Sequence, residues 1–531
     1  IERQSVSLPK IKRPKKYEGV DSTELLFILC NKKKLKLQEW NSEYQKRLNY
    51  ELEIIQKKKF QRYFLIVWDL VRWCRKNDVM IGSGRGSVGG SLVAYLLGIT
   101  CVDPLKYDLL FSRFINEERI DLPDIDIDFE DRKREQVRQY LEDKYGKDNV
   151  SGISTFLQMK GRATVRDISR VFDISINEAD TFAKAIEYGE DKSAIQKAIK
   201  ETQEGYDFES KYPDETKIML RLEGIVKAAG QHAAAVVISS ENLKFGTKGN
   251  LCRRGKDIVV SNWDMEDAEY VGLVKLDILG LSALSILSET KRLILENYRE
   301  NINFEQISIR DKKVLNMLSK GNTVGVFQLS TPLSTDMCKE VEIDIFEDIV
   351  SVLAIARPGS LHSGMTKDFI SRKHGRKWER KHRIYEEITK NTYGVLIFQE
   401  QVMEVFHKVA GLPYSVADNI RKIIGKKREA KEFEKYKEQF SEGCKKLKTF
   451  NSQEVEWFWN MLLKCANYLF NRSHAVEYGI LSQWTAYCKH YYPTEFICAS
   501  LTYGAEDKKI ELIEEAKRLG LKIIPPKIGL S

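Results

Sequence analysis

An alternating run of acidic and apolar residues, Asp124-Ile125-Asp126-Ile127-Asp128, restricts the fold more than any other feature. In a β-strand, side chains two residues apart share one face and are separated by roughly 6.5 Å. We therefore predict a strand over residues 120–129, with three carboxylates on one face and the two isoleucines packed on the other. Crowded carboxylates repel each other unless a cation or a proton compensates their charge. Hard oxygen ligands at this spacing suit Mg²⁺, although an edge strand with its acids facing solvent would have the same pattern.

A segment rich in Gly and Ser, residues 81–91, precedes the acidic run and lies between two segments with helical spacing. Glycine allows backbone N–H groups to come close to an anion, and Arg85 adds a bidentate phosphate donor. The segment has no Gly-Lys-Ser/Thr, so it is not a Walker loop. A helix rather than a strand precedes it, so it is not a dinucleotide-binding fingerprint. An ordinary turn is the alternative to a phosphate-binding loop.

A second apolar strand is predicted over residues 270–280, and it contains a single carboxylate, Asp277. A buried carboxylate without a partner is costly, so Asp277 needs a metal ion or a cationic side chain. Lys275 lies on the same predicted face, and a structural ion pair between the two is the alternative. A phosphate-binding loop together with carboxylates from two strands is the set of groups that two-metal nucleotidyl transfer requires.

Length and composition limit the class of protein. A chain of 531 residues with 42% hydrophobic residues is long enough for several domains with their own cores. No apolar run approaches the roughly 20 residues of a membrane helix. The nine cysteines are scattered and form no CxxC, which disfavours a zinc site or a disulfide framework and predicts a reducing, cytoplasmic location. The 86 Lys and Arg exceed the 77 Asp and Glu, which permits a polyanionic partner.

Longer motifs resemble the catalytic core of the α subunit of bacterial DNA polymerase III, a C-family replicative polymerase. The resemblance follows the family's order over nearly the whole chain. Asp128 favours the DnaE branch, because the PolC branch usually has Asn there. The segments that carry the resemblance are residues 82–91, 108–119, 122–129, 272–281, 325–330, 356–360, 393–403 and 470–474.

The resemblance implies a set of site residues. The catalytic residues and ligands of two Mg²⁺ ions would be Asp124, Asp126 and Asp277, with Asp128 outside the triad. The nucleotide-binding residues would be Gly86, Ser87, Arg119, Lys275, Arg472, Ser473 and His474. Arg472 stands where the family usually has Lys, which keeps the charge but not the geometry. Ser360 stands where the family usually has Pro.

The resemblance also implies a multidomain α/β (α+β) polymerase. Its palm, with a polymerase-β-like nucleotidyltransferase sheet, would comprise residues 1–155, including a basic lead-in, and residues 234–282. A mainly helical thumb would comprise residues 156–233, and fingers residues 283–531, C-terminally incomplete. The basic segment of residues 421–450 would suit a template backbone.

The activity implied is that of a DNA-directed DNA polymerase, a nucleotidyltransferase of DNA replication. It would extend the 3′-hydroxyl of a primer on primer-template DNA with dNTPs and release pyrophosphate. We expect the chain to be a piece of a longer polypeptide, without the family's PHP domain and C-terminal regions. The sliding clamp, the clamp loader and other replisome proteins would then be contacted through regions outside this chain.

Two other functions use the same features. A template-independent nucleotidyltransferase could be built on the same palm, but the long match to the family's fingers argues against it. A non-catalytic DNA-binding protein or replisome scaffold would need no metal ligands, and the complete set of Asp124, Asp126 and Asp277 argues against that function.

Overall fold

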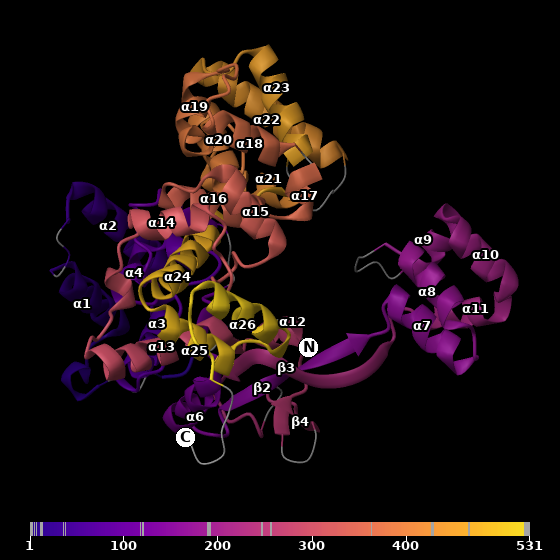
Figure 1. The fold of residues 1–531 in the computed structure, drawn as a ribbon, viewed down its shortest axis with the longest axis horizontal. Coiled ribbons are helices and arrows are strands. Elements are labelled where there is room, and N and C mark those ends of the chain that lie inside the picture. Colours follow the sequence, from indigo (N-terminus) through magenta and orange to yellow (C-terminus); the bar gives the residue numbers. More distant parts are fainter. Residues whose placement is uncertain are drawn as a thin grey trace. The chain divides into compact units, whose positions relative to one another are not determined.

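A computed structural model shows a mainly helical chain that folds as two units (Figure 1). Unit 1 comprises Ile1–Pro9 and Leu141–Leu276, and unit 2 comprises Lys10–Tyr140 and Asp277–Ser531. None of the helices in the described part of the chain is long and apolar enough to cross a membrane. The structure describes residues 4, 6, 8–10, 14–35, 37, 39–116, 118, 122–187, 193–245, 248–254, 258–362, 364–425, 430–465 and 468–524.

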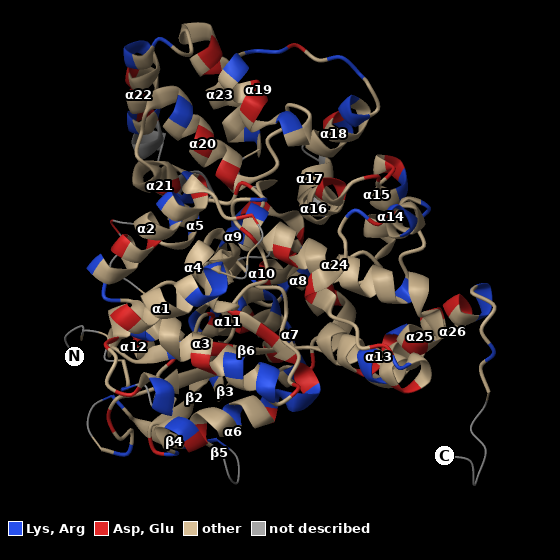
Figure 2. Ribbon diagram, turned by 90° about the vertical axis from the view of Figure 1, so that its left-hand side faces the viewer, with Lys and Arg blue, Asp and Glu red and all other residues tan. Residues whose placement is uncertain are grey.

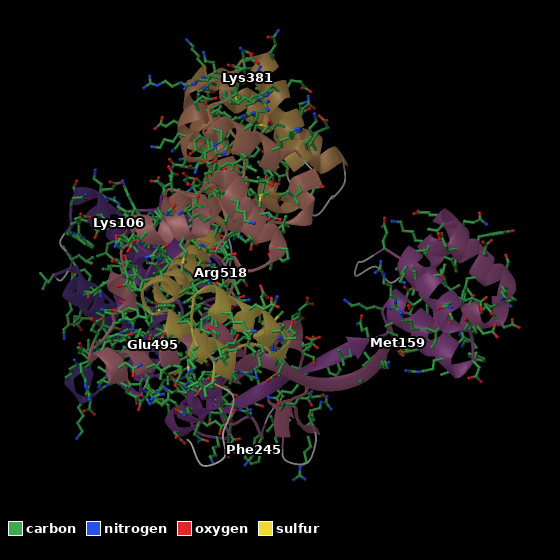
Figure 3. All side chains as sticks on the ribbon, in the orientation of Figure 1. Lys106, Met159, Phe245, Lys381, Glu495 and Arg518 are labelled. Carbon is green, nitrogen blue, oxygen red and sulfur yellow. The ribbon has the colours of Figure 1, made fainter. Side chains whose placement is uncertain are left out.

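Unit 1 is organised by a long antiparallel ribbon of β2 (Val150–Gln158) and β3 (Val226–Ile238). The ribbon is buried at the end where Val150 pairs with Ile238 and exposed toward the other end. Five helices gather at the exposed end, beyond Met159, which is labelled in Figure 3. They are α7 (Gly161–Val171), α8 (Ile176–Ala185), α9 (Ala194–Glu201), α10 (Gln203–Lys211) and α11 (Pro213–Leu222).

The mainly helical character predicted for residues 156–233 is confirmed for the described residues between Gly161 and Leu222 and is wrong at its ends. The start of β3 is rich in alanine, which favours a helix, but pairing with β2 overrides this preference. The helices have their own apolar core, in which the rings of Phe182 and Phe208 stack at 4.7 Å.

Six strands form a mixed sheet in the order β1-β6-β3-β2-β5-β4. In unit 1, β5 (Ile258–Ser261) runs parallel to β2, and β4 (Leu251–Arg254) pairs antiparallel with β5. The helix α12 (Met265–Tyr270) follows β5. The boundary between the units falls within α6 (Arg134–Tyr145) and within β6 (Val274–Leu281). The mixed α/β class is therefore confirmed, whereas the palm, thumb and fingers boundaries stay predictions.

Both predicted strands exist with different bounds. The acidic run enters a ladder only from Ile127, because β1 (Ile127–Glu130) is the part that pairs with β6. Pro123 has no N–H to donate to a ladder, and residues 119–121 lie outside the described part of the chain. The second strand starts at Val274 rather than at residue 270, because Tyr270 ends α12 and Gly272 turns the chain with a φ of +76°.

Unit 2 is built around α24 (Arg472–Tyr491), a helix that is buried along most of its length. Such a helix belongs in a core, and here it packs with α13, α14 and α16 in one large apolar cluster. A second cluster surrounds Phe406, Phe440 and Trp459.

The other helices of unit 2 fall into two stretches of the chain. Before β1 lie α1 (Ser22–Lys34), α2 (Ser42–Lys57), α3 (Gln61–Lys76), α4 (Leu92–Leu97) and α5 (Phe111–Phe114). After β6 lie α13 (Ser282–Tyr298), α14 (Lys312–Ser319), α15 (Pro332–Val341), α16 (Phe346–Ile355), α17 (Pro358–His362), α18 (Met365–Lys373), α19 (Arg383–Ile388), α20 (Gln399–Ala410), α21 (Tyr414–Gly425), α22 (Ala430–Leu447), α23 (Ser452–Cys465), α25 (Pro493–Tyr503) and α26 (Lys509–Arg518).

Buried Glu51 of α2 joins the Gly/Ser segment to the body of unit 2. Its carboxylate accepts hydrogen bonds from the Ser91 hydroxyl at 2.8 Å and from the backbone N–H groups of Leu92 and Val93 at 2.9 and 3.0 Å. Arg47, one turn earlier on α2, pairs with the same carboxylate at 2.6 Å. The end of the Gly/Ser segment and the start of α4 are therefore fixed by one side chain.

We predict that Glu51→Ala lowers the free energy of unfolding by roughly 3 kcal/mol, because it leaves buried N–H donors and Arg47 without their acceptor. Urea denaturation followed by tryptophan fluorescence measures the change. Glu53→Ala, an exposed change on the same helix, is the control and should cost less than about 0.5 kcal/mol. Equal effects of the two changes would contradict the anchoring role of Glu51.

Candidate active site

Three carboxylates from distant parts of the sequence converge in unit 2. Asp124, Asp126 and Asp277 each offer one carboxylate oxygen, and these oxygens lie within 4.8 Å of one another. The parallel register explains the meeting, because Ile127 of β1 stands opposite Ile278 of β6. The residues immediately before this pair are Asp126 and Asp277. The structure thus brings together all three predicted metal ligands.

The donor set fits a divalent cation. Carboxylate oxygens are hard ligands of the kind that Mg²⁺ prefers. Asp124 is exposed, whereas Asp126 and Asp277 are half-buried, so the cluster is open to solvent on one side. An ion pair with cationic side chains would offset the same charge, so the metal role of the three acids stays a prediction.

Tyr63 of α3 supports the acidic segment from inside the core. Its side chain is 2% exposed, and its hydroxyl accepts a hydrogen bond from the Ile125 N–H at 3.2 Å. Burial raises the pKa of Tyr63 above its usual range, and the three nearby carboxylates raise it further. The hydroxyl is therefore neutral at any physiological pH. No sequence pattern indicates Tyr63, which looks like one apolar residue among many on its helix.

Asp128, the third acid of the run, has a different set of partners. It is buried, and its carboxylate lies 3.1 Å from Nη1 of Arg85 and 3.4 Å from the hydroxyl of Tyr478. Burial raises the pKa of Asp128, while Arg85 opposes this rise. Asp128 thus orients Arg85 at the Gly/Ser segment.

The Gly/Ser segment, residues 81–91, runs along β1 and borders the carboxylates. The Gly82 N–H donates to the Asp128 carbonyl at 2.9 Å. Gly86 has a φ of +77°, and a Cβ placed on it would lie 3.8 Å from Oδ2 of Asp126. The predicted phosphate-binding loop and the predicted metal ligands are therefore neighbours.

The first turns of α24 hold this loop. Asn471 donates from Nδ2 to the Gly86 carbonyl at 2.9 Å, and Nδ1 of His474 accepts the Gly86 N–H at 3.2 Å. Asn471 also caps α24 by accepting the His474 N–H. Burial lowers the pKa of His474 to about 4, and Arg85 contributes, so His474 is a neutral acceptor. Of these residues, Gly86 and His474 were predicted from the sequence but Asn471 was not, although Asn471 belongs to the 470–474 motif.

The remaining predicted nucleotide-binding residues lie in different settings. Arg472 is buried, with its guanidinium donating to the Tyr107 carbonyl at 3.1 Å and pairing with Glu347 at 3.3 Å. Ser473 is buried beneath the loop, and Ser87 is half-buried within it. Lys275 belongs to unit 1, where its Nζ lies 3.4 Å from Sδ of Met265. Arg119 lies outside the described residues.

The segment predicted to contact template DNA, residues 421–450, is described in part. Residues 426–429 lie outside the described part, and much of the remainder is α22, on which Lys and Arg recur (Figure 2). Lys437 of α22 pairs with Glu456 at 2.8 Å, so at least one of these charges is neutralised within unit 2. The template role stays a prediction.

Comparison with known proteins identifies the family. Residues 24–280 match the family described as "Bacterial DNA polymerase III alpha NTPase domain", and residues 283–448 match "Bacterial DNA polymerase III alpha subunit finger domain". The chain belongs to the bacterial DNA polymerase III α family.

Relatives within the DNA polymerase III α family agree over almost the whole chain. DNA polymerase III subunit alpha of Aquifex aeolicus is 40% identical over 516 residues, which is 92% of this chain and 44% of the relative. Its counterpart in Bacillus subtilis is 38% identical over 92% of this chain and 44% of the relative, and that of Escherichia coli K12 is 37% identical over 92% and 43%. The chain spans less than half the length of these relatives.

We predict that Asp277→Asn weakens the binding of Mn²⁺ on the order of tenfold or more, because it removes one charged ligand from the cluster. Isothermal titration of the protein alone with Mn²⁺ measures the affinity. Asp128→Asn is the matched control and should leave the affinity within about threefold, since Asp128 pairs with Arg85. Equal weakening by both changes would mean that general negative charge, rather than the three-acid cluster, attracts the ion.

We predict that the imidazole of His474 titrates near pH 4. Its pKa in the unfolded chain is about 6.5, so between pH 6.5 and pH 4 the unfolded chain binds a proton that the folded chain does not. Stability from this group is therefore lost as the pH falls through that window. Histidine NMR titration of the wild type and His474→Gln identifies the signal, and the variant should show a shallower loss of stability. A titration of His474 near pH 6.5 would contradict its burial as a neutral acceptor.

Proposed function

We propose that this site catalyses template-directed DNA synthesis. The substrates would be a primer 3′-hydroxyl on primer-template DNA and a dNTP, and the products a primer longer by one nucleotide and pyrophosphate. The observation that carries the proposal is the convergence of Asp124, Asp126 and Asp277 beside the Gly/Ser loop. A metal site and an anion-binding loop side by side suit a nucleoside triphosphate better than either feature does alone.

The three carboxylates would hold two Mg²⁺ ions. When bound, the ions supply a lowered pKa for the 3′-hydroxyl and neutralise charge on the departing pyrophosphate. Little covalent chemistry is required of the protein, so the task of its residues is to position the reactants. Asp124, the exposed member of the cluster, is the ligand most accessible to the primer end.

The Gly/Ser loop would orient the triphosphate. Arg85 is only half-buried, and Asp128 and Tyr478 hold its guanidinium from one side, so its remaining donors can meet a phosphate. Gly86 and Ser87 lie at the turn next to Asp126. The contacts of Asn471 and His474 with Gly86 would keep this turn in place while the nucleotide enters.

Several finer assignments are part of the same proposal. The ribbon-borne helices α7–α11 would be the thumb, and the helices after β6 the fingers. Lys275, Arg119, Arg472 and Ser473 keep their predicted nucleotide-binding roles as hypotheses. Contacts with a sliding clamp, a clamp loader and other replisome proteins would be made by regions outside this chain.

We predict that Asp277→Ala reduces nucleotide incorporation by at least about 10³-fold and leaves the fold intact. Removal of one of three crowded acids relieves repulsion in the metal-free protein, so the melting temperature should stay the same or rise. Single-nucleotide extension of a labelled primer, together with thermal melting, measures both effects. Asp507→Ala, a change of an exposed acid in unit 2, is the control.

The same assay separates the competing functions. Extension of a single strand without template would indicate a template-independent nucleotidyltransferase. Unchanged incorporation by Asp277→Ala would exclude the metal role, and DNA binding without any incorporation by the wild type would favour a scaffold. Unfolding of Asp277→Ala would indicate a structural role for that carboxylate.

A further inference from the structure

A wholly buried glutamate lies directly beneath the Gly/Ser loop. Glu477 of α24 is 0% exposed. A Cβ placed on Gly89 would lie 2.7 Å from Oε1 of Glu477, and one placed on Gly84 would come closer still. Real Cβ atoms are not found at such distances. The two glycines therefore leave the space that the carboxyl group of Glu477 occupies.

The main chain of Glu477 contacts the loop as well. The hydroxyl of Ser83 donates to the Glu477 carbonyl, and the Ser83 carbonyl in turn accepts from the Thr100 hydroxyl at 2.6 Å. With Asn471 and His474 on Gly86, α24 thus touches the loop through residues three apart, as neighbouring positions on a helix surface are. Glu477 is the deepest of these contacts.

Glu477 occupies this position as a neutral acid. Burial raises its pKa well above the usual range, and the nearby Asp126 and Asp128 raise it further, against the opposing effects of the Gly89 N–H and Arg85. A neutral carboxyl group requires no counter-ion, so the volume that it fills against Gly84 and Gly89 is what it contributes. It leaves the charge balance among the acids and Arg85 unchanged.

We propose that Glu477 is a positioning residue that sets how closely the Gly/Ser loop approaches α24, and thereby where Gly86, Ser87 and Arg85 meet the triphosphate. This role rests on the proposed polymerase function. A shift of the loop changes the placement of the nucleotide relative to the Asp124, Asp126 and Asp277 cluster, because Gly86 borders Asp126. The expected signature is a change in KM for the dNTP and in loop mobility, beyond any loss of stability.

A substitution at Gly89 tests whether the space between the loop and Glu477 must stay free of a side chain. Gly84 has a φ of +129°, so a side chain there would strain the backbone whatever the space, but Gly89 is not in the left-handed region. Gly89→Ala therefore adds one methyl group against Glu477 and Ser473 with no backbone penalty. Glu477→Ala removes one of the two groups that this methyl would strike and leaves Ser473, so the double variant should be milder than Gly89→Ala alone.

The experiment measures single-nucleotide KM and kcat, and hydrogen exchange of residues 82–91, for the wild type and four variants. Gly89→Ala should raise KM for the dNTP on the order of tenfold, and Glu477→Ala severalfold with faster loop exchange. Glu477→Gln, which keeps the shape and neutrality, should stay within about twofold of the wild type, and Gly89→Ala/Glu477→Ala should fall well below the product of the single effects.

A matched control separates positioning from stability. Glu495 of α25, labelled in Figure 3, is also buried. It accepts a hydrogen bond from Nδ2 of Asn297 at 2.9 Å and makes its contact there rather than with the loop. Glu495→Ala should lower the melting temperature while KM and loop exchange stay unchanged. The proposal is overturned if Glu477→Ala behaves like Glu495→Ala, if Glu477→Gln is as impaired as Glu477→Ala, or if the two single effects multiply.

Failure of the polymerase function and failure of the positioning role of Glu477 give different results. If the wild type incorporates no nucleotide, the polymerase function fails before any variant is compared. Hydrogen exchange of the loop needs no substrate. Unchanged exchange in Glu477→Ala therefore overturns the positioning role whether or not the chain is a polymerase.

Discussion

Mutual repulsion among Asp124, Asp126 and Asp277 is the constraint on which the rest of the site depends. Two charges within 4.8 Å of each other repel by ~3–4 kcal/mol at an effective dielectric constant of about 20. Folding must hold them together before any cation arrives. Burial of a large apolar side chain contributes roughly 2 kcal/mol, and Ile125, Ile127 and Ile278 are all buried beside the acids. Apolar packing of β1 against β6 is therefore large enough to oppose the repulsion.

The side chains around the three acids are of two kinds, neutral and charged. Tyr63, His474 and Glu477 are all shifted by burial toward their neutral forms, and all three shape the backbone near the acids. Arg85 keeps its charge and is half-buried, held by Asp128. Neutral groups can thus support the loop and the acidic segment without competing with a metal ion or a phosphate for charge. The charges at this site are thus those of the three acids and of Arg85, which are exposed or half-buried.

The sequence alone predicted which acids converge, but not the strand register that brings them together. Alternation in the acidic run indicated Asp124, Asp126 and Asp128 alike, and the lone acid in an apolar strand indicated Asp277. Only the family resemblance set Asp128 apart from the other acids. No local pattern could reveal that Ile127 stands opposite Ile278, since register depends on the partner strand. Where a strand begins also depends on its partner strand, so the strand predicted over residues 120–129 starts too early. For helices, the sequence does not show which face meets the core. Tertiary packing decides this for α24, where Arg472 lies over the Phe398 ring and donates to the Tyr107 carbonyl.

The helix α24 couples the loop to the apolar core of unit 2. Asn471 both caps the helix and bonds the Gly86 carbonyl, so the start of α24 and the turn at Gly86 cannot move independently. Further along, Gly479 approaches Phe346 of α16 so closely that a Cβ would lie 3.2 Å from its ring. Close packing transmits displacement because well-packed interiors are hardly compressible. A shift of α16 against α24 would therefore reach the loop beside Asp126, which makes helix packing far from the acids part of what positions the loop.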